Sequence, residues 1–421
     1  MSIQIRAALS AGAAAIALAA CSQSASSPIG NSSLPGTQSF SMAQTGTSYH
    51  AACADDRRPH YMHCLALVRD DINGVGVDIT GVPKGLEPSQ FQAAYNINTS
   101  GGAGQVIALV DAYDNPNAAS DLAVYRSEWG LPACGAGCFT KYNQEGQTSN
   151  YPSGNEGWGV EEDLDIEMAS ATCPNCSIIL VEANSANNSD LGAAVTEAVK
   201  LGATVVSNSY QGSEYRNEDQ NTPYNQPVPV LASAGDGGYG TGYPSASQYV
   251  ISVGGTTLTS GGGGLRGWTE TVWNGTGSGC TQYAAKPSWQ TDPSCSNRMM
   301  NDISWDANPN TGPAEYDTYG EGGWFTVGGT SVSSPAVAGE IGAASANGLT
   351  NAGYIYANVA YRTYGVVHGN SPGAHKNSET VTLTDIISGS NGSCNTAYFC
   401  HAEKGYDGPT GVGTPYGMGA L

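Results

Sequence analysis

Five short apolar runs, each bounded by turn residues, constrain the fold of this chain more than any other feature. They alternate with stretches that have the length and periodicity of helices. Such runs are typical of strands that are buried on both faces, and their alternation with helices predicts a parallel sheet. The predicted strands are 105–112, 177–183, 204–209, 228–234 and 250–256, and the predicted helices are 117–128, 160–172 and 190–201.

We therefore expect an α/β fold with a doubly wound, mainly parallel sheet and helices on both faces. Ligand sites of such sheets lie beyond the carboxyl ends of the strands. The regular pattern begins near residue 86, so we expect one domain over 86–421. Residues 21–85 are then a flexible tether, rich in Ser, Gly and Thr, and a short pre-domain segment.

The first 20 residues predict an export signal. Arg6 precedes an apolar stretch at Leu9–Ala20 that is too short to span a bilayer. The stretch ends at Leu18-Ala19-Ala20-Cys21, which resembles the lipobox of bacterial lipoproteins and predicts lipidation of Cys21. Ordinary signal cleavage after Ala19 is the alternative. We expect a membrane-anchored lipoprotein facing the periplasm or the cell exterior, or a secreted form released from that anchor.

The remaining ten cysteines fall into neighbouring pairs. In an exported chain this pattern predicts local disulfides. A four-thiolate zinc site and a redox motif at Cys173–Cys176 are the alternatives. The pairs are Cys53/Cys64, Cys134/Cys138, Cys173/Cys176, Cys280/Cys295 and Cys394/Cys400, and the zinc alternative would use the second and third pairs.

The charge balance restricts the partners. The chain has 36 acidic and 15 basic residues, for a net charge of -21. Nucleic acids and anionic membrane surfaces need a basic footprint, so neither is an expected partner. A membrane contact is expected only through the lipid anchor, and we expect a monomer.

Ser331 is the candidate nucleophile. It stands in Gly329-Thr330-Ser331, four residues before Pro335, at the predicted start of a helix of small residues. There its hydroxyl is exposed, and the positive end of the helix stabilises an oxyanion. A helix N-cap is the alternative role. The motif is shared by the subtilisin and sedolisin families.

A serine nucleophile needs a base, and the six histidines do not stand in the sequence setting of a subtilisin base. Glu161 and Asp165 lie four residues apart, so they share one face of the predicted helix. Two carboxylates that close are expected to share a proton. Glu161 would accept the Ser331 proton and Asp165 would hold Glu161, although acids in a first helical turn are also common without function.

Asp236 follows a predicted strand in Ser233-Ala234-Gly235-Asp236-Gly237. A carboxyl group that stays neutral can donate a hydrogen bond to an oxyanion. An Asx turn beside glycines is the alternative. Asp111 ends the first strand where subtilisins have their triad aspartate, and without a histidine we expect it to be structural or to line the site.

These motifs, in this order, resemble the sedolisin family of serine-carboxyl peptidases over about residues 86–421. The resemblance implies a subtilisin-like fold, with Ser331, Glu161 and Asp165 as the triad and Asp236 as the oxyanion partner. Glu161 is preferred to Glu162 because of its spacing to Asp165.

The resemblance extends to a calcium site near the C-terminus. It implies one structural Ca²⁺ held by the Asp385 and Asp407 carboxylates and the Ile386 and Gly405 carbonyls. Oxygen ligands of this kind suit a hard cation. Glu403 departs from the family pattern, in which a glycine stands at this position.

The resemblance thus implies an endopeptidase that cleaves proteins or peptides at acid pH through an acyl-enzyme on Ser331. Family precursors carry a long folded prodomain, but only about 60 residues separate Cys21 from the domain here. A subtilisin-like peptidase acting near neutral pH and a non-catalytic surface lipoprotein are the alternatives.

Overall fold

The computed structural model describes residues 48–421 except 57, 71–82, 262–266, 346–347, 360, 364–365, 369–381 and 418. The predicted export signal, Cys21 and the tether up to residue 47 lie outside the described residues.

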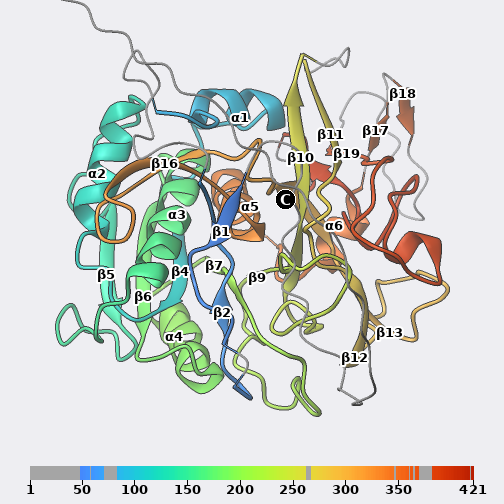
Figure 1. Ribbon diagram of the computed structural model, residues 1–421, viewed down its shortest axis with the longest axis horizontal. Helices are drawn as coiled ribbons and strands as arrows, with labels where there is room; N and C mark the ends of the chain where they lie inside the picture. The colour runs from blue at the N-terminus through green and yellow to red at the C-terminus, as the bar shows by residue number, and fades with distance from the viewer. Residues whose placement is uncertain are drawn as a thin grey trace, which may run out of the picture. The chain divides into compact units, whose positions relative to one another are not determined.

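An eight-stranded sheet forms the centre of the domain (Figure 1). Its strand order is β11-β10-β9-β7-β4-β6-β5, with β14 also paired to β10, and only β11 is antiparallel. The predicted α/β class and mainly parallel sheet are therefore confirmed. The strands are β4 (Val106–Ala112), β5 (Phe139–Asn143), β6 (Ser177–Ala183), β7 (Val205–Asn208), β9 (Val230–Ser233), β10 (Ile251–Ser260), β11 (Trp268–Val272) and β14 (Ile303–Asp306).

Helices cover both faces of this sheet because alternate side chains of each strand point to opposite sides. Ile107 and Leu109 of β4 pack in one apolar core with residues of α2, α3 and α5, whereas Ala108 and Val110 pack in a second core with residues of α4. The helices are α1 (Pro88–Tyr95), α2 (Ala118–Glu128), α3 (Glu156–Thr172), α4 (Asn188–Lys200), α5 (Thr330–Ala344), α6 (Gly353–Ala357) and the 3₁₀ helix η1 (Ala397–Phe399).

Smaller sheets surround the central one. A four-stranded sheet has the order β1-β3-β16-β15, another has the order β18-β17-β19-β20, and β12-β13 and β2-β8 form two-stranded pairs. Their strands are β1 (Tyr49–Ala51), β2 (His63–Cys64), β3 (Leu67–Arg69), β8 (Tyr210–Gln211), β12 (Gly279–Ala285), β13 (Asn297–Met300), β15 (Ala314–Asp317), β16 (Gly323–Gly328), β17 (Tyr361–Thr363), β18 (Val366–His368), β19 (Leu383–Thr384) and β20 (Thr414–Pro415). Strands from the predicted pre-domain segment therefore pair with strands of the predicted domain (Figure 1, blue).

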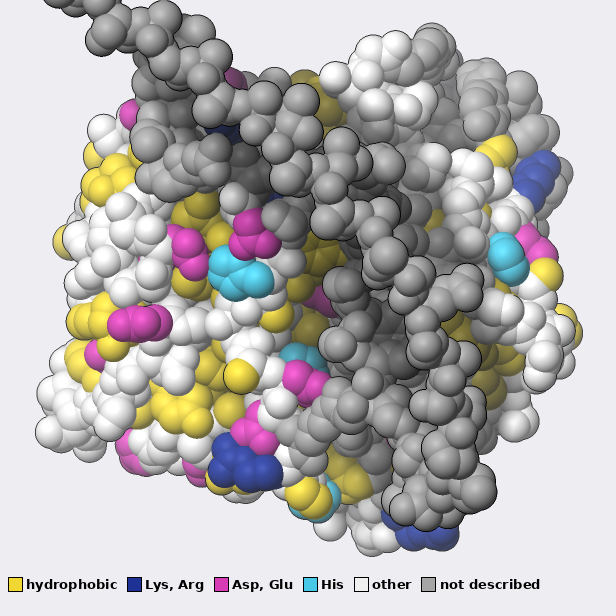
Figure 2. Space-filling view, in the orientation of Figure 1, with side chains coloured by type: hydrophobic (Ala, Val, Ile, Leu, Met, Phe, Trp, Pro, Cys, Tyr) yellow, Lys and Arg dark blue, Asp and Glu magenta, His cyan; other side chains and the backbone are white. Residues whose placement is uncertain are grey.

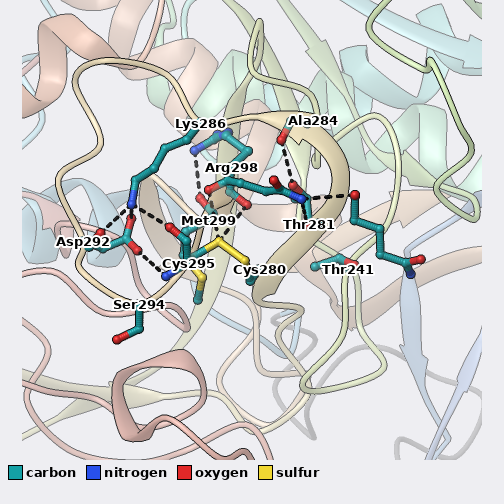
Figure 3. Close-up of a disulfide and its surroundings, with 12 residues drawn as sticks. Thr241, Cys280, Thr281, Ala284, Lys286, Asp292, Ser294, Cys295, Arg298 and Met299 are labelled. Atoms are coloured by element: carbon teal, nitrogen blue, oxygen red, sulfur yellow. Dashed lines mark hydrogen bonds and ion pairs between the residues drawn. A yellow bond between two sulfur atoms is a disulfide. The ribbon is translucent and has the colours of Figure 1, made fainter.

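All ten described cysteines form the five predicted disulfides. The four cysteines of the alternative zinc site are therefore in two disulfides and offer no thiolates. Figure 3 shows the Cys280–Cys295 bond beside Lys286, whose Nζ donates to the Cys295 carbonyl at 2.9 Å and forms an ion pair with Asp292. Reducing this disulfide would loosen the connection between β12 and β13.

Basic side chains do not gather into one patch on the face shown in Figure 2. The Lys and Arg side chains of the described residues lie there in a few separated places. Among the described helices, none is both long and apolar enough to cross a membrane.

Candidate active site

Ser331 is the second residue of α5, whose first residue, Thr330, follows Gly329. Gly329 has φ 98°, and a Cβ there would lie 2.0 Å from the Leu65 carbonyl oxygen. Another residue would therefore be strained and would clash. Ser331 is fully buried, and its Oγ donates to the Ser209 carbonyl over a long 3.4 Å.

Glu161 and Asp165 lie one turn apart on α3, which begins at Glu156 because the Asn155 side chain caps it by accepting from the Trp158 N–H at 3.1 Å. Both carboxyls are fully buried. Asp165 Oδ1 accepts from the Ser209 hydroxyl at 2.7 Å, and Asp165 Oδ2 has no hydrogen-bond partner among the described residues. Ser209 therefore contacts both the candidate nucleophile and the candidate triad aspartate.

Glu161 has one occupied and one open oxygen. Oε2 accepts from the Leu65 and Ala66 N–H groups at 2.8 and 2.7 Å. Oε1 has no hydrogen-bond partner among the described residues. Burial raises the pKa of this carboxyl, and the Ser331 hydroxyl lowers it in part, as a nearby donor does. Ser331 is therefore a neighbour of Glu161, and the bond of its Oγ to the Ser209 carbonyl is long for a hydroxyl.

Burial raises the pKa of Glu161 well above its ordinary value, and the Asp111 charge raises it further. Asp165 has a raised pKa for the same reasons, with Glu161 as an additional like charge. Burial also raises the pKa of Asp111 to about 8, and neither of its oxygens has a hydrogen-bond partner among the described residues. The three carboxyls therefore cannot all be ionised together, and Asp111 adds to the electrostatics of the pair.

Glu162 lies in a different environment. Its Oε2 accepts from the Asn115 N–H at 3.1 Å, and burial and the Glu182 charge raise its pKa. No described contact joins it to Ser331. The structure thus places Glu161, rather than Glu162, beside Ser331.

Asp236 lies in the turn that follows β9 and reaches the start of α5. Its Oδ1 accepts from the Thr330 N–H and hydroxyl, both at 2.8 Å. The residue is partly exposed, but Oδ2 is buried and has no hydrogen-bond partner among the described residues. Burial raises the pKa to about 7 although the Thr330 bonds lower it. Asp236 is therefore neutral in acid and has an oxygen free to donate.

Asp385 and Asp407 come together near the C-terminus, and the Asp385 charge raises the pKa of the Asp407 carboxyl, which burial has already raised. Gly405 N–H donates to both Asp385 oxygens at 3.1 Å, and Asp407 accepts from Glu403 N–H and from Thr410.

Two backbone carbonyls next to these residues are available as further oxygen ligands. Within the described residues, no backbone or side-chain donor bonds to the Ile386 or Gly405 carbonyl. Carboxylate and carbonyl oxygens are donor types that suit a calcium ion.

A second acidic group was not predicted from the sequence. One oxygen each of Asp121 (α2), Asp163 (α3) and Asp317 (β15) lie within 4.8 Å of one another. These residues are far apart in the chain, so no local motif signals the group. Ser209 was missed as well, although it ends a predicted strand at the edge where function is expected.

Comparison with known proteins shows which families the chain is similar to. Residues 150–352 match the subtilase family. The solved structure of Pseudomonas sedolisin, described as a serine-carboxyl proteinase in complex with pseudo-iodotyrostatin, superposes with a TM-score of 0.61 at 25% identity, covering 79% of this chain and 95% of that one. The chain is similar in sequence and fold to the sedolisins. The predicted resemblance and the subtilisin-like fold are confirmed.

Two relatives align in sequence with most of this chain. Kumamolisin from Bacillus sp. (strain MN-32) is 29% identical over 388 residues, or 81% of this chain. Sedolisin from Pseudomonas sp. (strain 101) is 26% identical over 375 residues, or 79% of this chain. The aligned regions span 64% and 60% of the length of these two relatives.

Proposed function

We propose that this chain is a serine-carboxyl endopeptidase that hydrolyses proteins or peptides in acid through an acyl-enzyme on Ser331. The observation that carries the proposal is that Ser331, Glu161 and Asp165 are all buried, with Ser331 and Asp165 both bonded to Ser209 and Ser331 acting on the pKa of Glu161. The Ser331 hydroxyl also lowers the pKa of the Glu161 carboxyl, as a nearby donor does, and this supports a carboxylate as the base.

Each residue has a defined part in the proposed reaction. Glu161 takes the proton of Ser331 as Oγ attacks the substrate carbonyl, and then gives it to the leaving amine. Asp165, fixed by the Ser209 hydroxyl, orients Glu161 and disperses its charge. Protonated Asp236 donates from Oδ2 to the oxyanion, and water then hydrolyses the acyl-enzyme.

The pH dependence follows from these groups. Asp236 carries its proton below a pKa of about 7 and loses it as the pH rises through that value, so oxyanion stabilisation is lost at alkaline pH. At the acid end the Glu161/Asp165 pair becomes fully protonated and no base remains, and burial raises the pKa values of both carboxyls. We therefore expect an optimum on the acid side of pH 7, with activity falling again at lower pH.

The calcium site and the location of the protein belong to the same proposal. The Asp385 and Asp407 carboxylates and the Ile386 and Gly405 carbonyls would hold one Ca²⁺, which would tie β19 to the 403–411 turn. Five disulfides are typical of an exported protein. We propose export with a lipid anchor at Cys21, which metabolic labelling with a fatty acid tests.

The test is cleavage of casein and of a quenched peptide by the full chain from pH 2.5 to 8.5 with calcium present. We expect activity that peaks in acid and is lost in Ser331→Ala and Glu161→Gln. Glu156→Gln is the matched control, because Glu156 lies exposed on the same helix. Activity at neutral pH that survives Glu161→Gln would favour the subtilisin-like alternative, and no activity from folded protein would favour a non-catalytic one.

A further inference from the structure

Three buried carboxyl groups from distant parts of the chain meet between α2, α3 and β15. Asp121, Asp163 and Asp317 are 2%, 0% and 0% exposed, and one oxygen of each lies within 4.8 Å of the other two. The two helices lie side by side (Figure 1), and β15 packs against both. We call these three residues the buried acidic group. They belong neither to the proposed catalytic residues nor to the proposed calcium site near the C-terminus.

Neutral donors hold the carboxylates of the buried acidic group in place. Asp121 accepts from the Thr318 N–H at 2.9 Å, and Asp163 Oδ2 accepts from Asn115 Nδ2 at 2.7 Å. Asp317 Oδ1 accepts from two backbone N–H groups of the turn after β15, both at 2.6 Å. None of the ion pairs among the described residues involves the group. Such donors orient carboxylates without neutralising them, as the outer partners of metal ligands do.

Asp163 has an oxygen that these donors leave open. Oδ1 is buried and has no hydrogen-bond partner among the described residues. Burial raises the pKa of this carboxyl well above its ordinary value, and the neighbouring Asp317 charge raises it further. A buried oxygen beside a like charge destabilises the fold unless a proton or a cation compensates it.

Glu315 is a fourth buried carboxyl at this place. It lies on the same face of β15 as Asp317, because alternate side chains of a strand point to the same side. It is 1% exposed, and neither of its oxygens has a hydrogen-bond partner within the described part of the chain. Burial raises its pKa well above the ordinary value, and the charges of Glu167, Asp317 and Asp163 raise it further. Glu315 therefore adds uncompensated negative charge beside the buried acidic group.

We propose that the buried acidic group binds one divalent cation of the calcium type through the carboxylates of Asp121, Asp163 and Asp317. Calcium takes carboxylate oxygens at about 2.3–2.6 Å, so two ligands of one ion lie at most about 5 Å apart. The 4.8 Å within which the three oxygens lie meets this condition. The ion supplies the positive charge that the described side chains around the group do not.

The bound ion has a structural role. It joins α3, which carries Glu161 and Asp165, to α2 and to β15, and both of these are distant from α3 in the chain. A cation that binds only the folded chain stabilises that fold. Ion binding needs no catalytic step, so it is independent of the proposed peptidase activity.

The first measurement is calorimetric titration of Ca²⁺ into the calcium-free full chain at pH 7, in a Ser331→Ala background that prevents digestion. We expect Asp163→Asn to bind one Ca²⁺ fewer per chain than its parent, or to bind it at least about tenfold more weakly, because one charged ligand is lost. The asparagine oxygen can still accept from Asn115 Nδ2, so the fold should persist. Glu128→Gln, an exposed change on α2, is the matched control and should leave the titration unchanged.

The second measurement separates this ion from the one proposed near the C-terminus. In an Asp385→Asn/Asp407→Asn variant, one Ca²⁺ should still bind and should still raise Tm. Adding Asp163→Asn should abolish both effects, and adding Asp121→Asn instead should do the same. Without calcium, Asp163→Asn should melt no lower than its parent, because a neutral amide replaces a buried acid.

Two results would overturn the proposal. One is equal stoichiometry and affinity for Ca²⁺ in Asp163→Asn and its parent. The other is a folded Asp385→Asn/Asp407→Asn variant that binds no Ca²⁺ at all. Shared protons would then neutralise the buried acidic group. Neither result bears on peptide cleavage, so the proposed peptidase would stand.

Discussion

Glu340 offers a test of how buried carboxyl groups set the pH range in which this fold is stable. It lies on α5 with no exposed surface, and its Oε1 accepts from Trp305 Nε1 at 2.8 Å. Oε2 has no hydrogen-bond partner among the described residues. Burial raises the pKa of this carboxyl from 4.5 to about 8, although the Trp305 bond lowers it.

The size of the effect on stability follows from the Glu340 pKa, which lies about 3.5 above its ordinary value, at about 1.4 kcal/mol for each pH unit. The folded pKa lies above the unfolded one, so between the two values the folded state holds more protons. The free energy of unfolding should therefore fall by up to about 5 kcal/mol between pH 4.5 and pH 8 on account of this residue alone. Glu340→Gln keeps the acceptor for Trp305 and cannot ionise, so it should remove this part of the slope.

The assay is urea unfolding followed by tryptophan fluorescence at pH 4.5, 6 and 8, in a Ser331→Ala background that excludes self-cleavage. We expect Glu340→Gln to gain about 3–5 kcal/mol relative to its parent as the pH rises to 8. Glu128→Gln, an exposed change at the end of α2, serves as the control. A difference between Glu340→Gln and its parent that stays constant with pH would refute the reasoning.

Two further predictions concern the proposed oxyanion partner and the proposed ion near the C-terminus. Asp236→Ala should lower kcat about 10²–10³-fold, because it removes the donor to the oxyanion. Asp236→Asn keeps a donor that does not titrate, so it should retain more activity and extend it above pH 7. Measurement of kcat from pH 3 to 8 tests both variants. Equal losses in both variants across this range would contradict a donor role. Asp407→Asn and Asp385→Asn should each remove the part of the calcium-dependent rise in Tm that this ion supplies, which corresponds to about 2.7 kcal/mol when calcium is at 100 times Kd. A rise in Tm as large as that of the parent in both variants would place the ion elsewhere.

The central sheet was predictable because its strands are buried on both faces and appear as continuous apolar runs. β6 has the predicted bounds, and β4, β7, β9 and β10 differ from theirs by a few residues. The edge strand β5 was missed, since most of its side chains are only partly buried and form no apolar run. α3 begins at Glu156 rather than Val160, because Asn155 caps it and two glycines weaken the local signal.

The candidate site, like the sheet, could be predicted from the sequence only in part. Ser331, Glu161, Asp165 and Asp236 stand in local motifs, so their residue types could be found from the sequence. The contacts of Leu65 and Ala66 with Glu161 were missed because backbone N–H groups make them, and every residue except proline has such a group. The flanking strands β2 and β3 are two and three residues long and pair with β8 and β16, more than 140 residues away, while β3 also pairs with the nearer β1. Only the fold brings these segments together.

The disulfides have a consequence for how the chain is oxidised. Each joins a cysteine to the next one along the chain, with sequence separations of 3, 4, 6, 11 and 15. Loops this short bring their two cysteines together in about 10–100 ns, although the disulfide bond itself forms over seconds to hours. Neighbouring cysteines therefore meet far more often than distant ones, which favours the observed pairing and reduces the need for reshuffling by an isomerase. The five disulfides can form one after another along the chain, beginning with the pair nearest the N-terminus.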